Sequence, residues 1–469
     1  MGLTSSQTRL IVLSLLVLAA AVGSLRVPHP AVASAETDPA PPNIVVVLTD
    51  DMRTDEMDAL RKTNDLLVDQ GTTFTHAIAP TSLCCPARAA LLTGTYSHTN
   101  NVWSNEGPLG GWPVFQPMEA DTIATTLDSL GYQTGYFGKY LNGWGSSSTV
   151  SPPGWDSFAA TANYGKDPYF GYDIAGTLPT EHMGGAEEDY STDVYGTRAA
   201  DFIASTPEST PFLTIFAPHA PHSPFTSAPR YQGSWPLEDL VPPANEQDMG
   251  DKPSFMQALP LLKRSQLKAT LRKQHEALLP VDDAVQQIVS AVGPSRVANT
   301  LFIFTSDNSL MNGDHRMTGK AMPHAGATQI PMVMRWDGVI DSGAITSRLL
   351  TLQDVTATIA EAAGATFPTE GISWLSGRRD GSVVEGIEST RDHIVRPAYC
   401  GWRTSRYLYV RYSNGAGEEL YDYSTDPAEL RNAIFNTQYA AIADQMRTAA
   451  QSVCDPGPPG FSWDVQPTP

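Results

Sequence analysis

Several reactive side chains each follow a short run of β-branched and aromatic residues. Asp50 and Asp51 come directly after NIVVVLT, Lys139 after YQTGYFG, His222 beyond PFLTIFA, and Asp307 with Asn308 after TLFIFTS. Such runs are typical of buried strands, and in open α/β sheets ligands bind at the carboxyl ends of the strands. Singly, an Asp pair can cap a helix, and a Lys or His can be a surface residue. Their repetition favours one shared site.

The acidic and amide residues of these clusters indicate a divalent cation. Asp50, Asp51, Asp307 and Asn308 offer only oxygen donors, which suit calcium or magnesium and disfavour zinc. Carboxylates brought close together also repel one another, and a bound cation relieves that repulsion. The sequence therefore predicts a Ca²⁺ site, with Mg²⁺ as the other candidate.

The segment SLCCPARAALLTG places two cysteines just before a proline. Pro86 is typical of the first turn of a helix, so the Cys84 thiol would face the positive end of the helix dipole and its free N–H groups. That end of a helix attracts anions. A disulfide between Cys84 and Cys85, or two buried thiols, would fit the same residues, and the helix argument alone leaves these alternatives open.

Strand-like runs alternate with helical patterns along most of the chain, which indicates an α/β fold. The sheet is expected to be mainly parallel and covered by helices on both faces. Gly, Pro and Ser are abundant in residues 144–190 and 223–255, which are expected to be long loops. The helices are expected at Thr54–Gln70, Asp121–Leu130, Ser191–Ile203 and Ser265–Val292.

After Gly371 the pattern changes to that of a small α+β domain. Strands at residues 405–412 and 418–423 would pair as antiparallel neighbours through Asn414-Gly415, and a helix is expected at Gln438–Val453. The expected organisation is a signal peptide at residues 1–35, a catalytic domain at 36–384 and the small domain at 385–469.

The start of the chain has the features of a secretory signal peptide. Arg9 precedes an apolar run from Leu10 to Val22, and Ala33-Ser34-Ala35 provides small residues for cleavage. The alternative is a membrane span, but the run is shorter than the roughly 20 residues that cross a bilayer. We therefore expect a secreted product with no membrane span after signal removal.

The net charge of the chain bears on the partners that it can bind. The chain of 469 residues has 30 Lys and Arg against 50 Asp and Glu, a formal net charge of −20. Non-specific nucleic-acid binding depends on basic surface, so no nucleic-acid partner is expected.

Cys400 and Cys454 both lie in the small domain of an exported chain, and a disulfide between them is expected. Two buried thiols are the alternative.

The motif Cys84-x-Pro86-x-Arg88, followed by Leu92-Thr93-Gly94, resembles the signature of type I sulfatases, in which the leading Cys is oxidised to Cα-formylglycine. The resemblance runs from about Asn43 to Tyr439 and implies an alkaline-phosphatase-like sandwich. The doublet Cys84-Cys85 and the string GKYLN at 138–142 are most similar to the N-acetylglucosamine-6-sulfatase branch. Other matching strings are TDD at 49–51, APHSP at 220–224, SDN at 306–308 and ELYDY at 419–423.

The resemblance implies a role for each site residue. Modified Cys84, as a hydrated aldehyde, would attack sulfur with one hydroxyl, and the other hydroxyl would expel sulfate. Asp50, Asp51, Asp307 and Asn308 would hold the cation, which also contacts residue 84. Lys139 and Lys320 would hold the sulfate, His222 would protonate the departing oxygen, and Arg88 would orient the formylglycine. A sulfated carbohydrate or another sulfate ester is the implied substrate, and a formylglycine-generating enzyme is the implied maturation partner.

Lys320 is assigned by its position eleven residues before Pro331, and a loop lysine without function is the alternative. The chain also departs from the usual family pattern near these motifs. Ser309 replaces a Gly, Met311 and Leu141 each stand where a His is usual, and Ala325 replaces a Glu. These positions surround the substrate and not the nucleophile, so they bear on substrate identity more than on the reaction.

Two other functions fit the same residues. A phosphate or phosphonate monoester hydrolase of the same superfamily would use similar machinery on a phosphoryl group. A non-catalytic sulfoglycan-binding protein would keep the fold without oxidation of Cys84, but such a protein has no need of the complete Cys-x-Pro-x-Arg motif.

We predict that Cys84 is oxidised and that Cys85 is not, because only Cys84 stands two residues before Pro86 and four before Arg88. Fragment-ion mapping of the peptide should place the aldehyde at Cys84. An aldehyde at Cys85, or two free thiols in active protein, would overturn this assignment. Cys84→Ala should abolish turnover while circular dichroism shows the fold preserved.

Overall fold

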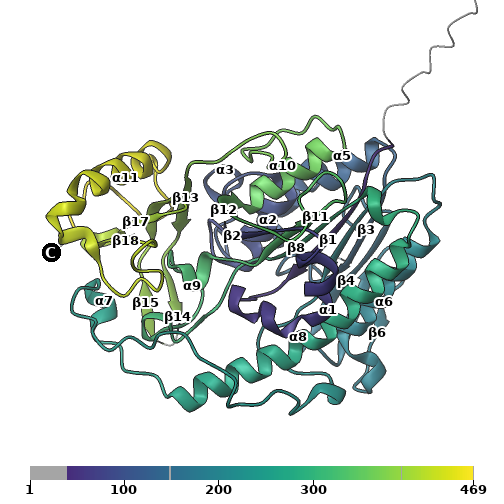
Figure 1. Cartoon of the computed structure of the whole chain (residues 1–469), viewed down its shortest axis with the longest axis horizontal. Coiled ribbons are helices and arrows are strands. Elements are labelled where there is room, and N and C mark those ends of the chain that lie inside the picture. Colours follow the sequence, from purple (N-terminus) through teal and green to yellow (C-terminus); the bar gives the residue numbers. More distant parts are fainter. Residues whose placement is uncertain (1–39, 147–148, 392, 468–469) are drawn as a thin grey trace, which may run out of the picture. The chain divides into compact units, whose positions relative to one another are not determined.

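A ten-stranded sheet with the order β12-β2-β11-β8-β1-β7-β3-β4-β5-β6 forms the centre of the described chain (Figure 1). The computed structural model describes residues 40–146, 149–391 and 393–467, so the expected signal peptide at 1–35 lies outside the described residues. β1 (Asn43–Thr49) is parallel to both of its neighbours, β7 (Phe212–Ala217) and β8 (Thr300–Ser306). Every residue of β1 is buried, as expected for a β-branched strand covered on both faces.

The sheet is parallel at its centre and mixed at its edges. β3 (Gln133–Gly138) and β4 (Ser157–Tyr164) continue the parallel part beyond β7. β11 (Met332–Arg335) is antiparallel to both β8 and β2. The remaining strands are β2 (Thr72–Ile78), β12 (Ala344–Thr351), β5 (Tyr172–Gly176) and β6 (Glu181–His182).

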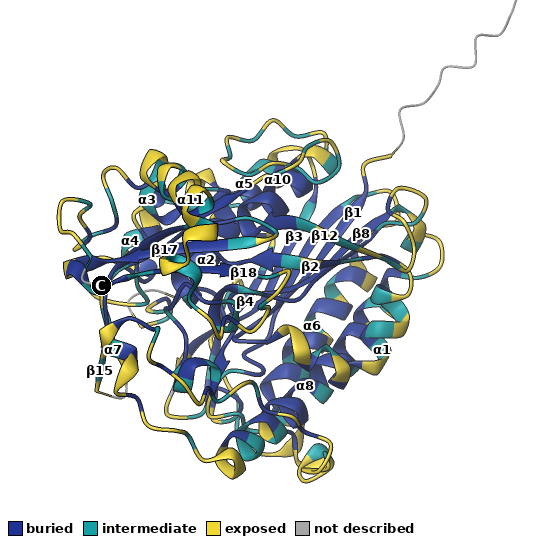
Figure 2. Cartoon of the chain, turned by 60° about the vertical axis from the view of Figure 1, so that its left-hand side comes forward, coloured by how far each residue is buried: buried dark blue, intermediate teal, exposed yellow. Residues whose placement is uncertain are grey.

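Alternate residues of β1 divide the core into two layers. Ile44, Val46 and Leu48 pack with residues of α2 (Cys84–Thr93), α5 (Ile123–Ser129) and α10 (Leu352–Ala362). Val45 and Val47 pack with residues of α6 (Ser191–Ser205) and α8 (Arg264–Val292) on the other face. In Figure 2 the strands are buried, whereas α6 and α8 turn exposed residues away from the sheet. The structure therefore confirms the α/β class expected from the alternating pattern.

A four-stranded antiparallel sheet lies near the end of the described chain. Its order is β13 (Ser382–Gly386), β16 (Tyr399–Arg403), β17 (Tyr407–Tyr412) and β18 (Glu418–Asp422). Residues of α11 (Ala440–Val453) share one apolar cluster with this sheet. A disulfide joins Cys400 in β16 to Cys454 after α11, which confirms the expected pairing. The domain boundary after residue 384 falls within β13 and stays a prediction.

Short elements complete the described structure. These short elements are α1 (Arg61–Thr63), α3 (Ser97–Asn100), α4 (Trp112–Phe115), α7 (Ser254–Gln257), α9 (Ala325–Thr328), β9 (Met311–Asn312), β10 (Thr318–Gly319), β14 (Ser389–Arg391) and β15 (Ile394–Arg396). Among the helices of the described residues, long or short, none has both the length and the hydrophobicity that a membrane span requires.

Two expectations from the sequence are wrong in detail. The helix expected at Thr54–Gln70 is broken at Leu60, where ψ is 69° and the backbone leaves the helical region. Asp282 of α8 accepts hydrogen bonds from the backbone N–H groups of Lys62 and Thr63, so a tertiary contact starts a new helical turn there. The expected loop at 144–190 contains β4, β5 and β6, whose formation depends on pairing with β3.

We expect the Cys400–Cys454 disulfide to stabilise the protein by about 4 kcal/mol, because it closes a loop whose ends are 54 residues apart. The double variant Cys400→Ala/Cys454→Ala should lose this much free energy of unfolding in urea denaturation. A reductant should destabilise the wild-type protein and leave the double variant unaffected. Equal urea midpoints for wild type and double variant would contradict the prediction.

Candidate active site

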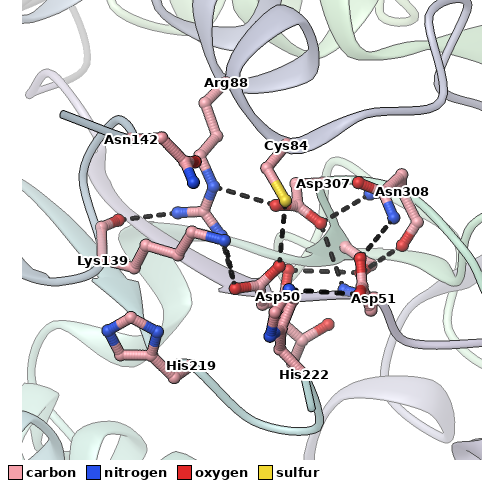
Figure 3. A network of polar contacts seen from close by, with 12 residues as sticks. Asp50, Asp51, Cys84, Arg88, Lys139, Asn142, His219, His222, Asp307 and Asn308 are labelled. Carbon is pink, nitrogen blue, oxygen red and sulfur yellow. Dashed lines mark hydrogen bonds and ion pairs between the residues drawn. The ribbon is translucent and has the colours of Figure 1, made fainter. Parts of the chain in front are cut away.

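The carboxyl ends of adjacent strands bring the expected site residues into one network (Figure 3). Strands β3, β7, β1 and β8 are neighbours and run in the same direction, so the residues that follow them meet at one edge of the sheet. α2 and the segment after β10 add the remaining side chains. The network contains Asp50, Asp51, Cys84, Arg88, Lys139, His222, Asp307, Asn308 and Lys320.

Each of the three buried carboxylates has a cationic partner. Asp307 Oδ2 accepts a hydrogen bond from Arg88 Nε at 2.9 Å, and Asp50 Oδ2 lies 2.5 Å from Lys139 Nζ. Asp51 is paired with Lys320. Each carboxylate therefore has one positively charged side chain beside it.

The charges around the carboxylates set their protonation. Burial opposes the ionisation of Asp50, but nearby cations, above all Lys139, hold the pKa of its carboxyl well below the usual value. Burial acts on Asp51 in the same way, and Lys320 is the main group that lowers its pKa. The pKa of Asp307 is raised, because burial and the charge of Asp50 outweigh the nearby cations. Asp50 and Asp51 are thus carboxylates at neutral pH.

Asn308 carries the clearest sign of a missing ligand at this edge. Its Nδ2 donates to Asp51 Oδ1 at 2.6 Å, but its buried Oδ1 has no hydrogen-bond partner among the described residues. A buried polar atom without a partner is uncommon, and an unseen ion is one of its ordinary explanations. Oxygens of Asp50 and Asp51 lie in the same group of potential metal ligands, together with atoms of Cys84 and His222. This group combines two carboxylates with a thiol and an imidazole, does not include Asp307, and could hold a metal ion.

Cys84 begins α2 and lies inside the charged cluster. Its Sγ is 2.8 Å from Lys320 Nζ and 3.5 Å from Asp50 Oδ1. Burial raises the pKa of the Cys84 thiol to about 11. An unmodified Cys84 is therefore a neutral thiol at physiological pH, and a thiol is a much weaker nucleophile than a thiolate.

The contacts of Cys85 indicate a structural role, and Cys85 forms no disulfide with Cys84. Both cysteines are free, which excludes the vicinal disulfide left open by the sequence. The Cys85 N–H donates to Asn105 Oδ1 at 2.9 Å, and the N–H of Asn142 donates to Cys85 Sγ at 3.0 Å. Cys85 thus ties the start of α2 to the segment that follows Lys139.

Arg88 links two parts of the site from the middle of α2. Besides its bond to Asp307, its Nη1 donates to the backbone carbonyl of Lys139 at 2.6 Å. The Tyr136 hydroxyl donates to the same carbonyl at 2.5 Å. Arg88 is 1% exposed, so these contacts are protected from water. The guanidinium therefore fixes α2 against both β8 and the end of β3.

Residues near the end of the described chain hold the segment that carries Lys320. The Arg396 guanidinium donates to the carbonyls of Lys320 and Thr318. His324, four residues beyond Lys320, lies with Nε2 3.0 Å from Glu419 Oε2. Although burial opposes its ionisation, the pKa of Glu419 falls to about 2, mainly because of His324. Both ends of this segment are thus anchored to the region that follows residue 390.

His222 is the most accessible member of the network, with 30% of its side chain exposed. Its Nδ1 lies 2.7 Å from the carbonyl of Ser223, which can only accept, so Nδ1 carries a hydrogen. Nε2 then faces the cluster, 3.6 Å from Asp51 Oδ2. This ring nitrogen can exchange a proton with a group bound at the mouth of the site.

Some residues in or around the network were not expected from the sequence. His219 lies beside Lys139 (Figure 3). Asn142 and Asn105 contact Cys85. Arg396 supports Lys320 from a distance of 76 residues along the chain. The repeated Pro-His pairs in APHAPH were the available signal for His219. The other contacts are made by the fold between distant segments and have no local pattern.

Known proteins share both the sequence and the fold. The profile of the sulfatase family matches residues 42–365, and that of the N-sulphoglucosamine sulphohydrolase C-terminal region matches 313–454. N-acetylglucosamine-6-sulfatase of Homo sapiens is 31% identical over 437 residues, covering 86% of this chain and 77% of the human protein. The enzyme of the same name from Capra hircus is 32% identical; the alignment covers 69% of this chain but only 60% of the goat protein.

A solved protein in complex with its substrate D-glucosamine-2-N,6-O-disulfate has a TM-score of 0.74 at 20% identity, covering 88% of this chain and 97% of that one. This likeness confirms the expected alkaline-phosphatase-like arrangement of the sheet and its helices. The family profile and the human relative each span most of the described chain and include the network around Cys84. The chain therefore belongs to the sulfatase family.

Proposed function

We propose that this sulfatase hydrolyses the 6-sulfate of a glucosamine-type sugar, such as N-acetylglucosamine 6-sulfate, with Cys84 converted to formylglycine. The observation that carries the proposal is the position of Cys84, which begins α2 within hydrogen-bond reach of Lys320 and beside Asp50. The human and goat relatives are named for the 6-sulfate of N-acetylglucosamine, and the solved relative binds a glucosamine 2-N,6-O-disulfate. A sulfate at O6 of glucosamine is common to all three.

The proposed cofactors fit the residues around Cys84. Formylglycine would supply a hydrated aldehyde as nucleophile, and Ca²⁺, or Mg²⁺ as the other candidate, would supply Lewis-acid charge. Asp50, Asp51, Asp307 and Asn308 are the residues proposed to hold the cation. The unpartnered Oδ1 of Asn308 and the position of Asp50 and Asp51 in one group of potential metal ligands support this assignment.

The two lysines are proposed to bind the sulfate oxygens. In the structure each ammonium pairs with a carboxylate proposed as a metal ligand, Lys139 with Asp50 and Lys320 with Asp51. A cation that neutralises these carboxylates would leave both ammonium groups available to an anionic substrate. Positive charge held in a buried site stabilises the charge that develops on sulfuryl oxygens far better than charge in water does.

The sugar oxygen that leaves needs a proton, because an alkoxide is a poor leaving group. His222 is proposed as the general acid, since Nδ1 is held by the Ser223 carbonyl and Nε2 faces the cluster. Arg88 is proposed to orient residue 84, because it lies four residues further along α2 and is fixed by Asp307.

Export and maturation form part of the proposal. The pattern of residues 1–35 supports secretion, and the Cys-x-Pro-x-Arg motif supports recognition by a formylglycine-generating enzyme before the chain folds. Cys84 is 0% exposed in the folded protein, so an enzyme that oxidises it needs the unfolded segment.

The proposed function is tested by the rates of the purified enzyme on four substrates: N-acetylglucosamine 6-sulfate, its 6-phosphate, an aryl sulfate and an aryl phosphate. We expect turnover of both sulfates to exceed that of the matching phosphates. A preference for phosphates would favour the phosphate or phosphonate monoester hydrolase. No turnover of any ester, with Cys84 found unoxidised by mass spectrometry in protein made together with a formylglycine-generating enzyme, would favour a binding protein.

His222→Ala should slow hydrolysis of the sugar sulfate by about 10²–10⁴-fold, the usual contribution of a general acid. The same variant should slow an activated aryl sulfate much less, because a nitrophenolate leaves without a proton. His98→Ala, at a histidine paired with Glu385 outside the network, is the control and should affect neither substrate. Equal losses on both substrates would show that His222 mainly binds sulfate, and the acid role would be withdrawn.

Calcium should raise the thermal midpoint of the protein and a chelator should lower it, because a ligand bound only by the folded state stabilises that state. Asn308→Ala should weaken Ca²⁺ binding by about tenfold or more in titration calorimetry. The control is Asn43→Ala, which removes a buried amide at the opposite end of β1. Unchanged affinity in Asn308→Ala would exclude Asn308 as a ligand.

A further inference from the structure

The loop that carries His222 follows β7 and is tied to the end of β1. Its residues 218–228 are all described and form no helix or strand. The backbone N–H of Asp50 donates to the Ala220 carbonyl at 3.1 Å, which joins the first half of the loop to the residue after β1. The N–H of Phe225 donates to the His222 carbonyl at 3.1 Å and closes a turn there. A side chain on a loop keeps its position only where such contacts hold the backbone.

A tyrosine between β4 and β5 holds the backbone of His222 itself. The Tyr169 hydroxyl donates to the His222 carbonyl at 2.7 Å, and the His219 carbonyl lies farther from the same oxygen, at 3.5 Å. Tyr169 is 0% exposed, and its ring stacks on that of Tyr190 with the centroids 5.6 Å apart. Burial, reinforced by Tyr190, raises the pKa of the Tyr169 hydroxyl well above its usual value. The hydroxyl therefore keeps its proton and remains a donor to the loop.

Two further contacts hold the same loop beyond His222. Thr226 Oγ1 donates to Asp167 Oδ2 at 2.9 Å, and Asp167 Oδ1 accepts from the backbone N–H of Tyr169 at 2.9 Å. The Asp167 carboxylate thus joins the loop to the residue that supplies the hydroxyl. The Tyr190 hydroxyl, just before α6, donates to the Thr226 carbonyl at 2.8 Å. The segment between β4 and β5 and the start of α6 therefore fix the backbone from His222 to Thr226.

The His222 ring is oriented through its own backbone. Nδ1 bonds to the carbonyl of Ser223, the next residue, so this bond moves with the loop. Nε2 lies 3.6 Å from Asp51 Oδ2, which is beyond a normal hydrogen bond, and 30% of the side chain is exposed. The position of Nε2 thus depends on where the backbone of residues 222 and 223 lies.

We propose that Tyr169 is a positioning residue for the general acid, and that its hydroxyl fixes the backbone of His222 so that Nε2 stays within reach of the departing oxygen. The inference rests on the proposed function, in which His222 protonates that oxygen. Proton transfer requires hydrogen-bond distance in the transition state, so a general acid that is displaced even slightly transfers its proton less readily. One hydroxyl group thus gives the β4–β5 hairpin a part in the reaction.

Tyr169→Phe tests the inference, because it removes the hydroxyl and keeps the buried ring. We expect kcat for N-acetylglucosamine 6-sulfate to fall about tenfold, as for a slightly misplaced catalytic group. KM should change little, because the proposed sulfate ligands are Lys139 and Lys320. An activated aryl sulfate, whose leaving group needs no proton, should be hydrolysed at close to the wild-type rate. Circular dichroism should show the wild-type fold.

Tyr172→Phe is the matched control. Tyr172 begins β5 of the same hairpin, is also 0% exposed, and its hydroxyl has no hydrogen-bond partner among the described residues. This variant should keep the wild-type rates on both substrates. Thr226→Val removes the bond to Asp167 and leaves the Tyr169 hydroxyl in place. It should show the same selective loss on the sugar sulfate at a smaller size, and it replaces Tyr169→Phe if that variant does not fold.

The outcomes separate this inference from the proposed function. A selective loss on the sugar sulfate in His222→Ala, without a selective loss in Tyr169→Phe, would overturn the inference and leave the acid role intact. Equal losses on both substrates in Tyr169→Phe would show that the tyrosine only stabilises the fold, which would also overturn it. If His222→Ala slows both substrates equally, or if the formylglycine enzyme hydrolyses neither, the proposed function fails at that step and the inference fails with it.

Discussion

Three carboxylates, those of Asp50, Asp51 and Asp307, are almost completely removed from water at the edge of the central sheet. Burying an unpaired charge is so costly that a protein neutralises the group or pairs it. Here Arg88, Lys139 and Lys320 provide the pairing. α2, the end of β3 and the segment after β10 each place one of these cations beside a carboxylate.

The same pairs make the site suitable for an anionic substrate and a divalent cation. A lysine that balances a carboxylate in one state can hold a sulfate in another, provided that a cation replaces it beside the carboxylate. The Oδ1 of Asn308, which has no hydrogen-bond partner among the described residues, is the ligand that we propose for such an ion.

Chain segments far apart in sequence hold the site in position. Arg396 and Glu419 fix the segment with Lys320, and Cys85 fixes the segment with Asn142. A cavity beside Lys139 depends on the order of β7, β3 and β4 in the sheet. The lining of this cavity thus comes from several strands, whereas Cys84, Cys85 and Arg88 lie close together in the short segment that forms α2.

The sequence by itself determined the α/β class, the strands that precede the site and most of the residues that the structure brings together at the carboxyl edge of the sheet. These features are local, because buried strands and helix starts depend on the pattern of neighbouring residues. Only the tertiary structure decided that each carboxylate has its own cation, that Cys84 and Cys85 are separate thiols, and that β4 to β6 replace an expected loop. Those features depend on contacts between distant segments, and edge strands form only when a neighbouring strand supplies their hydrogen bonds.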